Sequence, residues 1–297
     1  MTEIQQLVAM LRSSGPDLAC PPPQARENFA AMMANIPVAE DFRFQAVTLG
    51  GVDGLKISSA QSAADAALLY LHGGAFVIGS AHAYRNLAGE LGRAGGMDSY
   101  AMDYRLAPEH PFPAAVEDGV AAYRALLEQG MQASRIVVGG DSAGGGLSLS
   151  VLLRAREQGL PMPAAALLLS PWTDLACEGV SMAGKQAADP ALSREWLLDM
   201  RDLYLGGADP HQPLASPLHA DLKGLPPLLI QVGSAEILLS DATRLAQQAG
   251  SHDVATALEI WPDMVHVWQA FGFMLSPGRQ AIDRAGEFMR RHTANEK

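Results

Sequence analysis

Hydrophobic and polar residues divide most of the chain into two kinds of segment. Short, continuous apolar runs of strand length lie at Ala66–Leu71, Asp98–Tyr104, Arg135–Gly139, Ala164–Ser170, Leu228–Val232 and Ala255–Ile260. Longer segments with apolar residues at helical spacing lie at Ala114–Gln129, Ala143–Gln158, Leu239–Ala249 and Gly278–Arg291. Continuous apolarity indicates strands that are covered on both faces, and parallel strands need crossover helices. The pattern therefore predicts an α/β fold with a mostly parallel central sheet and helices on both faces.

The N-terminal part of the chain has a different pattern. Helical spacing covers Glu3–Arg12 and Gln24–Ala34, and the three prolines at 21–23 separate the two segments. From Phe42 to Lys56 the period changes to two, with adjacent glycines at 50 and 51. We therefore expect two N-terminal helices followed by an antiparallel hairpin.

The interval Glu178–Leu222 breaks the alternation of strands and helices. It contains one helical stretch, Ser193–Tyr204, within a segment rich in Gly, Pro and Asp, and no strand pattern. We interpret this interval as an insertion that covers an edge of the sheet.

Composition limits the class of protein. The 297 residues are 48% hydrophobic and 18% charged, which is enough to bury a large core without disulfides. Lys and Arg number 21 against 32 Asp and Glu, a net charge of −11 without a basic stripe, so nucleic acid is not an expected partner. Cys20 and Cys177 have neither disulfide nor metal-ligand spacing. The start of the chain resembles no signal peptide, and no apolar run is long enough to span a bilayer. We expect a cytoplasmic protein without stable membrane insertion.

The strongest chemical motif is the pentapeptide at 140–144, Gly-Asp-Ser-Ala-Gly, between a predicted strand and a predicted helix. In this context G-x-S-x-G is the nucleophile elbow, where a strained turn exposes a serine and small neighbours avoid clashes. Ser142 is the candidate nucleophile. The alternative is an ordinary glycine-rich turn, which the surrounding strand and helix make less favourable. For Asp141 we favour a structural role.

A second glycine motif, His72-Gly73-Gly74-Ala75-Phe76, follows the strand Ala66–Leu71. Consecutive glycines allow backbone amides to point into a cavity and stabilise a tetrahedral oxyanion. We assign the amides of Gly73, Gly74 and Ala143 as oxyanion-hole donors. A flexible turn and a phosphate-binding loop are the alternatives, and the latter lacks the Lys and Ser/Thr of a P-loop.

A serine nucleophile needs a histidine that a carboxylate holds, in the chain order Ser, acid, His. Among eight histidines, His266 lies between the last predicted strand and the last helix, where a loop can return to the elbow. For the acid we favour Glu236, just past the strand Leu228–Val232, and keep Asp241 and Asp263 as alternatives.

These motifs resemble those of the bacterial hormone-sensitive-lipase-like esterases (family IV) within the α/β-hydrolase superfamily. Residues 72–76 are similar to the family's HGGG/HGGAF motif, and residues 140–145 to its GDSAGG elbow. Residues 103–109 and 112–115 resemble its DYRLAPE…FPAA segment, and the resemblance extends from Leu68 to the C-terminus. In that segment we expect Tyr104 and a buried charge pair formed by Arg105 and Glu109 to hold the loop under the site.

The resemblance has implications for the site and for the domains. It implies an acid 30 residues before the histidine, which is Glu236, although the family more often has Asp at this position. It implies a helical cap, so we divide the chain into an N-terminal cap segment (1–40), an α/β-hydrolase core (41–177 and 223–297) and a cap insertion (178–222). It implies no metal and no organic cofactor.

The predicted activity is hydrolysis of short to medium acyl esters by a serine carboxylesterase with a Ser142-His266-Glu236 triad and an acyl-enzyme intermediate. An amidase, a carbamate hydrolase and an acyltransferase would use the same site, and a non-hydrolytic receptor on the same scaffold is a further alternative. Five apolar side chains of the expected cap either line an acyl pocket or form plain cap core, and the second arrangement is the commoner. They are Phe29, Met32, Met33, Met200 and Tyr204. The expected partner is a small-molecule ester; the oligomeric state stays open, with a homodimer among the alternatives.

Overall fold

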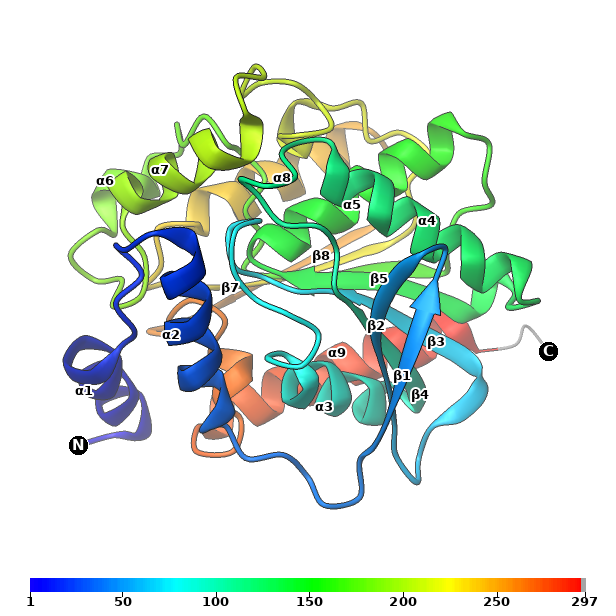
Figure 1. Cartoon of the computed structure of the whole chain (residues 1–297), viewed down its shortest axis with the longest axis horizontal. Coiled ribbons are helices and arrows are strands. Elements are labelled where there is room, and N and C mark those ends of the chain that lie inside the picture. Colours follow the sequence, from blue (N-terminus) through cyan, green and yellow to red (C-terminus); the bar gives the residue numbers. More distant parts are fainter. Residues whose placement is uncertain (295–297) are drawn as a thin grey trace.

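The computed structural model describes residues 1–294, which fold around one eight-stranded sheet (Figure 1). Its strand order is β1-β2-β4-β3-β5-β6-β7-β8. The strands are β1 (Arg43–Leu49), β2 (Val52–Ser58), β3 (Ala63–Leu71), β4 (Met97–Met102), β5 (Ile136–Asp141), β6 (Ala165–Leu169), β7 (Leu228–Gly233) and β8 (Thr256–Trp261). β1 and β2 form the predicted antiparallel hairpin at one edge, and β4, β3 and β5 to β8 are mutually parallel. The predicted α/β class with a mostly parallel sheet is confirmed.

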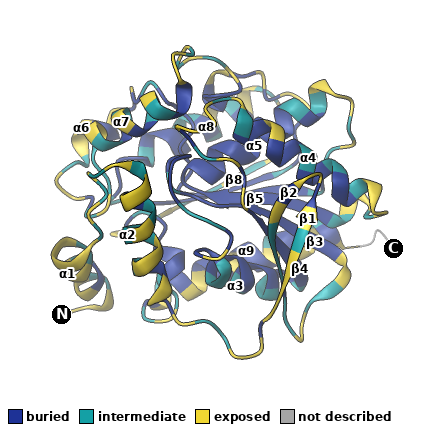
Figure 2. Ribbon diagram, viewed as in Figure 1, coloured by how far each residue is buried: buried dark blue, intermediate teal, exposed yellow. Residues whose placement is uncertain are grey.

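Helices cover both faces of the sheet (Figure 1). On one face α3 (Arg85–Gly95) packs against α9 (Ser276–Thr293), and on the other lie α4 (Ala114–Glu128), α5 (Ala143–Glu157) and α8 (Leu239–Ser251). Successive residues of β3 enter the two cores in turn, Leu69 and Leu71 on the α4–α5 side and Leu68 and Tyr70 on the α3–α9 side. Figure 2 shows the strands of the sheet centre as buried.

Helix α3 is absent from the sequence prediction. Its sequence includes three glycines, Gly89, Gly92 and Gly95, which lower helix propensity and hide the helical period. The close packing explains them, because a Cβ on Gly89 would lie 2.6 Å from the Phe42 ring and one on Gly92 would lie 2.3 Å from the Ser99 Oγ. Tertiary packing therefore selects residues that local propensity disfavours.

Strand β8 also differs from its prediction. A continuous apolar run indicates cover on both faces, but β8 is an edge strand whose residues are all half-buried or exposed. Ile260, for example, is 47% exposed. An edge strand has a neighbour on only one side, so burial falls even where the sequence remains apolar.

The two segments outside the alternating pattern form helices as predicted. α1 (Glu3–Ser14) and α2 (Pro22–Ala34) precede the sheet, and residues 178–222 contain α6 (Ser181–Gly184), α7 (Arg194–Leu205) and no strand. The remaining elements are single turns, η1 (Ala133–Arg135), η2 (Pro217–His219) and η3 (Trp268–Phe271).

The N-terminal helices contact the insertion directly. The Arg12 guanidinium on α1 donates to the Ala187 carbonyl at 2.9 Å, and the Trp196 indole on α7 donates to the Leu18 carbonyl at 3.1 Å. α1, α2, α6 and α7 consequently lie on the same side of the molecule (Figure 1).

Candidate active site

Ser142 occupies a sharp turn between β5 and α5. Its φ is 53° and its ψ is −123°, a conformation that a non-glycine residue adopts rarely and that indicates strain at a functional site. The turn is held by backbone hydrogen bonds: the Ser142 amide donates to Leu169, and its carbonyl accepts from Trp172. Ser142 is 7% exposed, at the N-terminus of a buried helix.

The two glycines of the elbow are required by space. A Cβ on Gly140 would lie 2.1 Å from the Leu71 carbonyl oxygen, and one on Gly144 would lie 1.9 Å from the same atom. Both contacts are far shorter than real Cβ atoms tolerate. The end of β3 and the elbow can approach each other only because neither residue has a side chain.

The loop after β3 lies beside the elbow and corrects one sequence assignment. The Gly73 amide donates to the Asp141 Oδ1 at 2.9 Å, so this amide is engaged and cannot at the same time bind a substrate oxygen. Among residues 1–294, no acceptor takes the amides of Gly74, Ala75 or Ala143. Ala75 also has a positive φ of 52°, which turns its peptide group away from extended geometry. The available donors are therefore Gly74, Ala143 and Ala75, the last of which the sequence assignment lacks.

His266 and Glu236 meet at the ends of β8 and β7. The His266 Nδ1 lies 2.9 Å from the Glu236 Oε2, and Glu236 is fully buried. The second Glu236 oxygen accepts from the Gly233 amide at 2.6 Å and from the Ser170 hydroxyl at 2.9 Å. Burial lowers the pKa of His266, but the hydrogen bond and the charge of Glu236 outweigh burial and raise that pKa above its ordinary value.

The two alternative carboxylates lie elsewhere. The Asp241 Oδ2 accepts from the amides of Thr173 and Asp174, so this buried residue holds the chain after β6. Asp263 is exposed, and its amide donates to the Ser234 hydroxyl. Of the three candidates, only Glu236 contacts His266.

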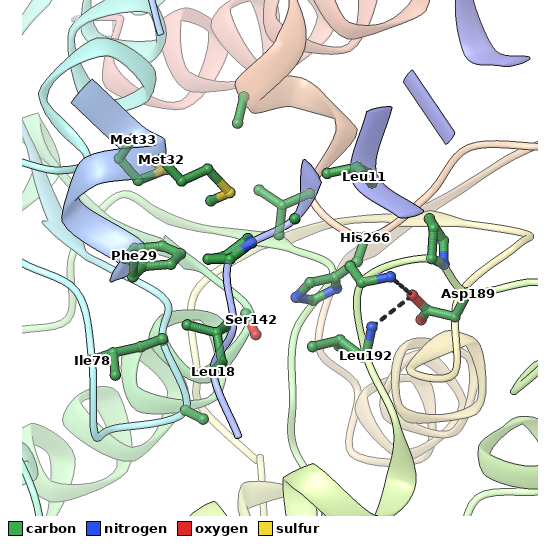
Figure 3. A pocket seen from close by; sticks show the side chains of 18 of the residues that line it. Leu11, Leu18, Phe29, Met32, Met33, Ile78, Ser142, Asp189, Leu192 and His266 are labelled. Atoms are coloured by element: carbon green, nitrogen blue, oxygen red, sulfur yellow. Dashed lines mark hydrogen bonds between the residues drawn. The ribbon is translucent and has the colours of Figure 1, made fainter. Parts of the chain in front are cut away.

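Ser142 and His266 line one cavity of about 580 Å³ (Figure 3). Its walls come from the loop after β3, from α1 and α2, and from residues 187–192 of the insertion. Phe29, Met32 and Met33 of α2 are part of this lining. Met200 and Tyr204 instead belong to the buried core, where the Tyr204 ring stacks on Phe76 with centroids 3.8 Å apart.

The polar residues of the 103–109 segment do not form the expected pair. Arg105 pairs with Asp118 at 2.7 Å, while Glu109 pairs with Arg26 of α2 at 2.6 Å. The side chains of Arg105 and Glu109 are 48% and 50% exposed, so neither belongs to a buried ion pair. Tyr104 matches the expectation, because it is buried and donates to the His72 carbonyl at 2.7 Å below the glycine loop.

Comparison with known proteins identifies the family of this fold and site. A family model described as alpha/beta hydrolase fold matches residues 68–270. An acetyl-hydrolase of Streptomyces hygroscopicus is 51% identical over 226 residues, which cover 76% of each chain. Among solved structures, an esterase from the bacterial hormone-sensitive lipase family is 44% identical, with a TM-score of 0.95 over 98% of both chains. The esterase EstE5, soaked with p-nitrophenyl butyrate, is 47% identical, with a TM-score of 0.95 over 99% of both chains.

The chain belongs to the bacterial hormone-sensitive lipase family of α/β-hydrolase esterases.

The protein is a serine ester hydrolase, and its site includes two residues that the sequence analysis missed. Ser170, at the end of β6, donates to Glu236 and accepts from the Val267 amide, so it connects the carboxylate with the loop of His266. Asp189, in the insertion, accepts from the Ile237 amide at 2.9 Å beside Glu236 and lines the cavity. Neither residue belongs to a sequence motif, although Ser170 is the last residue of a predicted strand.

Two further features of the esterase concern its surroundings. Within residues 1–294, no helix is both long and apolar enough to cross a membrane. In the same part of the chain, no group of three or more His, Cys, Asp or Glu side chains is arranged to hold a metal ion.

Asp141, next to Ser142 in the elbow of the esterase, is a buried carboxylate. Its Oδ1 accepts from the Tyr70 hydroxyl at 2.5 Å and from the Gly73 amide. Burial raises the pKa of Asp141 to about 6, although hydrogen bonds from Tyr70 and Gly73 and the nearby His266 act in the opposite direction. The structural role favoured from the sequence agrees with these contacts.

We expect Asp141→Asn to stabilise the esterase more at pH 8 than at pH 5. The folded-state pKa of Asp141 is above its ordinary value of 3.8, so the free energy of unfolding decreases as the pH rises through about 6. Asparagine keeps an acceptor for Gly73 but never ionises, and the pH-dependent part of the gain is about 1 to 2 kcal/mol. Urea unfolding at both pH values measures it, with the exposed Asp199→Asn as the control for loss of a charge. An equal gain at both pH values contradicts the prediction.

Proposed function

We propose that this esterase hydrolyses short to medium acyl esters through a Ser142-His266-Glu236 triad and an acyl-enzyme intermediate. One observation carries the proposal: the 2.9 Å contact between His266 and the buried Glu236 occurs on the wall of the cavity into which Ser142 opens. The Glu236 contact occupies Nδ1 and leaves Nε2 for the serine proton.

In the first half of the reaction, the ester carbonyl carbon is attacked by the Ser142 oxygen while His266 Nε2 takes the hydroxyl proton. The carbonyl oxygen becomes an oxyanion, which the amides of Gly74, Ala75 and Ala143 bind. Such donors contribute about 3 to 4 kcal/mol each to the transition state. The intermediate collapses when the C–O bond to the alcohol breaks, and His266 gives its proton to the leaving oxygen.

In the second half, water enters the same position. His266 takes a proton from the water as its oxygen attacks the acyl carbon, and it then returns the proton to Ser142 as the acid leaves. Glu236 stabilises the imidazolium in both halves through its contact with Nδ1. Ser170 and Gly233 keep the carboxylate oriented, because both donate to its other oxygen.

The cavity and the relatives both support the proposed substrate class. The cavity lining combines Phe29, Met32 and Met33 with the polar groups of Ser142 and His266, which suits an ester with an apolar acyl chain. A related protein is named an acetyl-hydrolase, and EstE5 was soaked with a butyrate ester. We further propose that residues 1–40 and 178–222 act together as a cap, which the contacts of Arg12 and Trp196 support.

Covalent labelling tests the proposed nucleophile. We expect diethyl p-nitrophenyl phosphate to inactivate the enzyme with one phosphoryl group per chain, located by mass spectrometry on the peptide that contains Ser142. An excess of p-nitrophenyl butyrate should slow the inactivation by the phosphate ester, because substrate and inhibitor compete for one serine. Labelling at another residue, or inactivation without a Ser142 adduct, would contradict the proposal.

A further inference from the structure

A second hollow of about 490 Å³ adjoins the catalytic cavity. It lies between α1, α2 and the chain that follows η3. The two hollows share part of their lining: Leu11, Gly15, Pro16, Met32 and Phe271. They are therefore neighbouring spaces with a common wall of side chains. We call the second hollow the outer groove.

The outer groove is open to the surface and has a mostly apolar lining, in which Ser14, Asn28 and Asn35 are the polar residues. Met10, Ile36, Phe273 and Met274 belong to it, and no residue of its described lining is charged. Met10 and Phe273 are 39% and 44% exposed, two of the few large hydrophobic side chains on the surface of the described chain. Apolar side chains gathered around one hollow suit an apolar ligand.

The common wall can change shape. Leu11, Met32 and Phe271 are all half-buried, so each has free space on at least one side. Methionine is unbranched and has three rotatable side-chain bonds, which lets it fill a gap in one rotamer and open it in another. Met32 is therefore the most adaptable part of the wall.

The geometry of the site indicates which part of an ester points toward this wall. The leaving alcohol takes its proton from His266, so it lies on the His266 side of Ser142. In Figure 3, His266 and Asp189 lie on one side of Ser142, while Phe29 and Ile78 lie on the other. Met32 lies on the Phe29 side in this view. We place the acyl chain on that side, opposite the leaving alcohol.

We propose that the outer groove binds the distal part of a linear acyl chain that is longer than the catalytic cavity accommodates, with the Met32 side chain as a movable divider. The inference rests on the proposed function, and it specifies the medium-chain end of that substrate class as esters of about eight to ten acyl carbons. The wall that the groove shares with the catalytic cavity and its uncharged lining support this occupant rather than a polar ligand. Each methylene that leaves water contributes about a fourfold gain in affinity.

Two adjacent alanines on α2 provide the test. Ala31 is exposed and lines the outer groove, whereas Ala30 is also exposed and lines neither hollow. We expect Ala31→Trp to fill the groove and lower the ratio of kcat/KM for p-nitrophenyl decanoate to that for p-nitrophenyl butyrate by about tenfold. This fall corresponds to loss of contact with about two methylenes. Ala30→Trp, the matched control, should leave the ratio within twofold of the wild type.

A second variant tests the divider. We expect Met32→Ala to join the two hollows and to shift the preferred acyl length toward longer chains, so that the decanoate-to-butyrate ratio rises severalfold. Ester concentrations stay below those at which the substrates form micelles.

The outcomes separate this inference from the proposed function. Equal ratios in Ala31→Trp, Ala30→Trp and the wild type, with butyrate hydrolysis intact, overturn the groove and leave the triad in place. A change in sedimentation of Ala31→Trp at an unchanged ratio also overturns it, since the groove would then hold a second copy of the chain. If Ala31→Trp lowered the decanoate-to-butyrate ratio only when the esters were presented on vesicles, the groove would bind a lipid surface. That result would also overturn the inference.

Discussion

Replacement of Ser142 by alanine is expected to lower kcat/KM for p-nitrophenyl butyrate by about 10⁴- to 10⁶-fold. In the proposed mechanism the Ser142 hydroxyl oxygen forms the acyl-enzyme, so its loss removes the covalent route and leaves only binding and oxyanion stabilisation. The backbone of residue 142 keeps its positive φ, which alanine tolerates about as well as serine. Stopped assays with high enzyme concentration measure the residual rate.

The matched control for this variant is Ser150→Ala, two turns further along α5. Ser150 is also buried, and its hydroxyl donates to the Gly146 carbonyl within the helix rather than facing the cavity. We expect this variant to keep activity within a few-fold of the wild type, and both variants to show nearly wild-type circular dichroism. A Ser142→Ala protein with a tenth or more of wild-type activity would disprove the nucleophile.

Replacement of Glu236 by glutamine is expected to lower kcat by about 10³- to 10⁴-fold. The amide cannot stabilise the imidazolium, and its NH₂ group favours the wrong histidine tautomer. The Glu236→Gln replacement should also move the acidic limb of the pH profile of kcat/KM to lower pH. His266 must be neutral to act as a base, and the charge and hydrogen bond of Glu236 hold its pKa above the ordinary value despite burial. Without the charge, the pKa of His266 decreases and the neutral form persists to lower pH.

Asp241→Asn serves as the control for this experiment. Asp241 is another fully buried carboxylate, five residues further along the chain, but its contacts are with Thr173 and Asp174. We expect the acidic limb of the Asp241→Asn pH profile to stay at the wild-type pH. If Glu236→Gln leaves the limb unmoved, or if Asp241→Asn moves it, then Glu236 is not the group that tunes His266.

Local sequence predicts most of this fold because each strand and helix has its own period. The strands β3 to β7 and the helices α4, α5, α8 and α9 lie close to their predicted ranges. Helix α3 is the exception, since its glycines fit close contacts with Phe42 and Ser99 that no local pattern contains. The exposure of β8 depends in the same way on its place at the edge of the sheet.

The candidate site shows the same division. Strand–turn–helix context alone directs attention to Ser142, and position past a strand tip favours Glu236 over Asp241. The engagement of the Gly73 amide by Asp141 is different, because it depends on how the loop after β3 lies against the elbow. Ser170 and Asp189 escape sequence analysis for a similar reason: each acts through a partner more than 40 residues away.

The sequence by itself determined the class of the protein, the α/β alternation and the residue types of the chemistry, since these follow from side-chain periodicity and from the steric needs of one tight turn. Only the tertiary structure decided which carboxylate contacts His266, which amides remain available to an oxyanion, and which α2 side chains face the cavity. Those choices depend on distances between segments far apart in the chain, and packing sets such distances through the whole fold rather than through any local pattern.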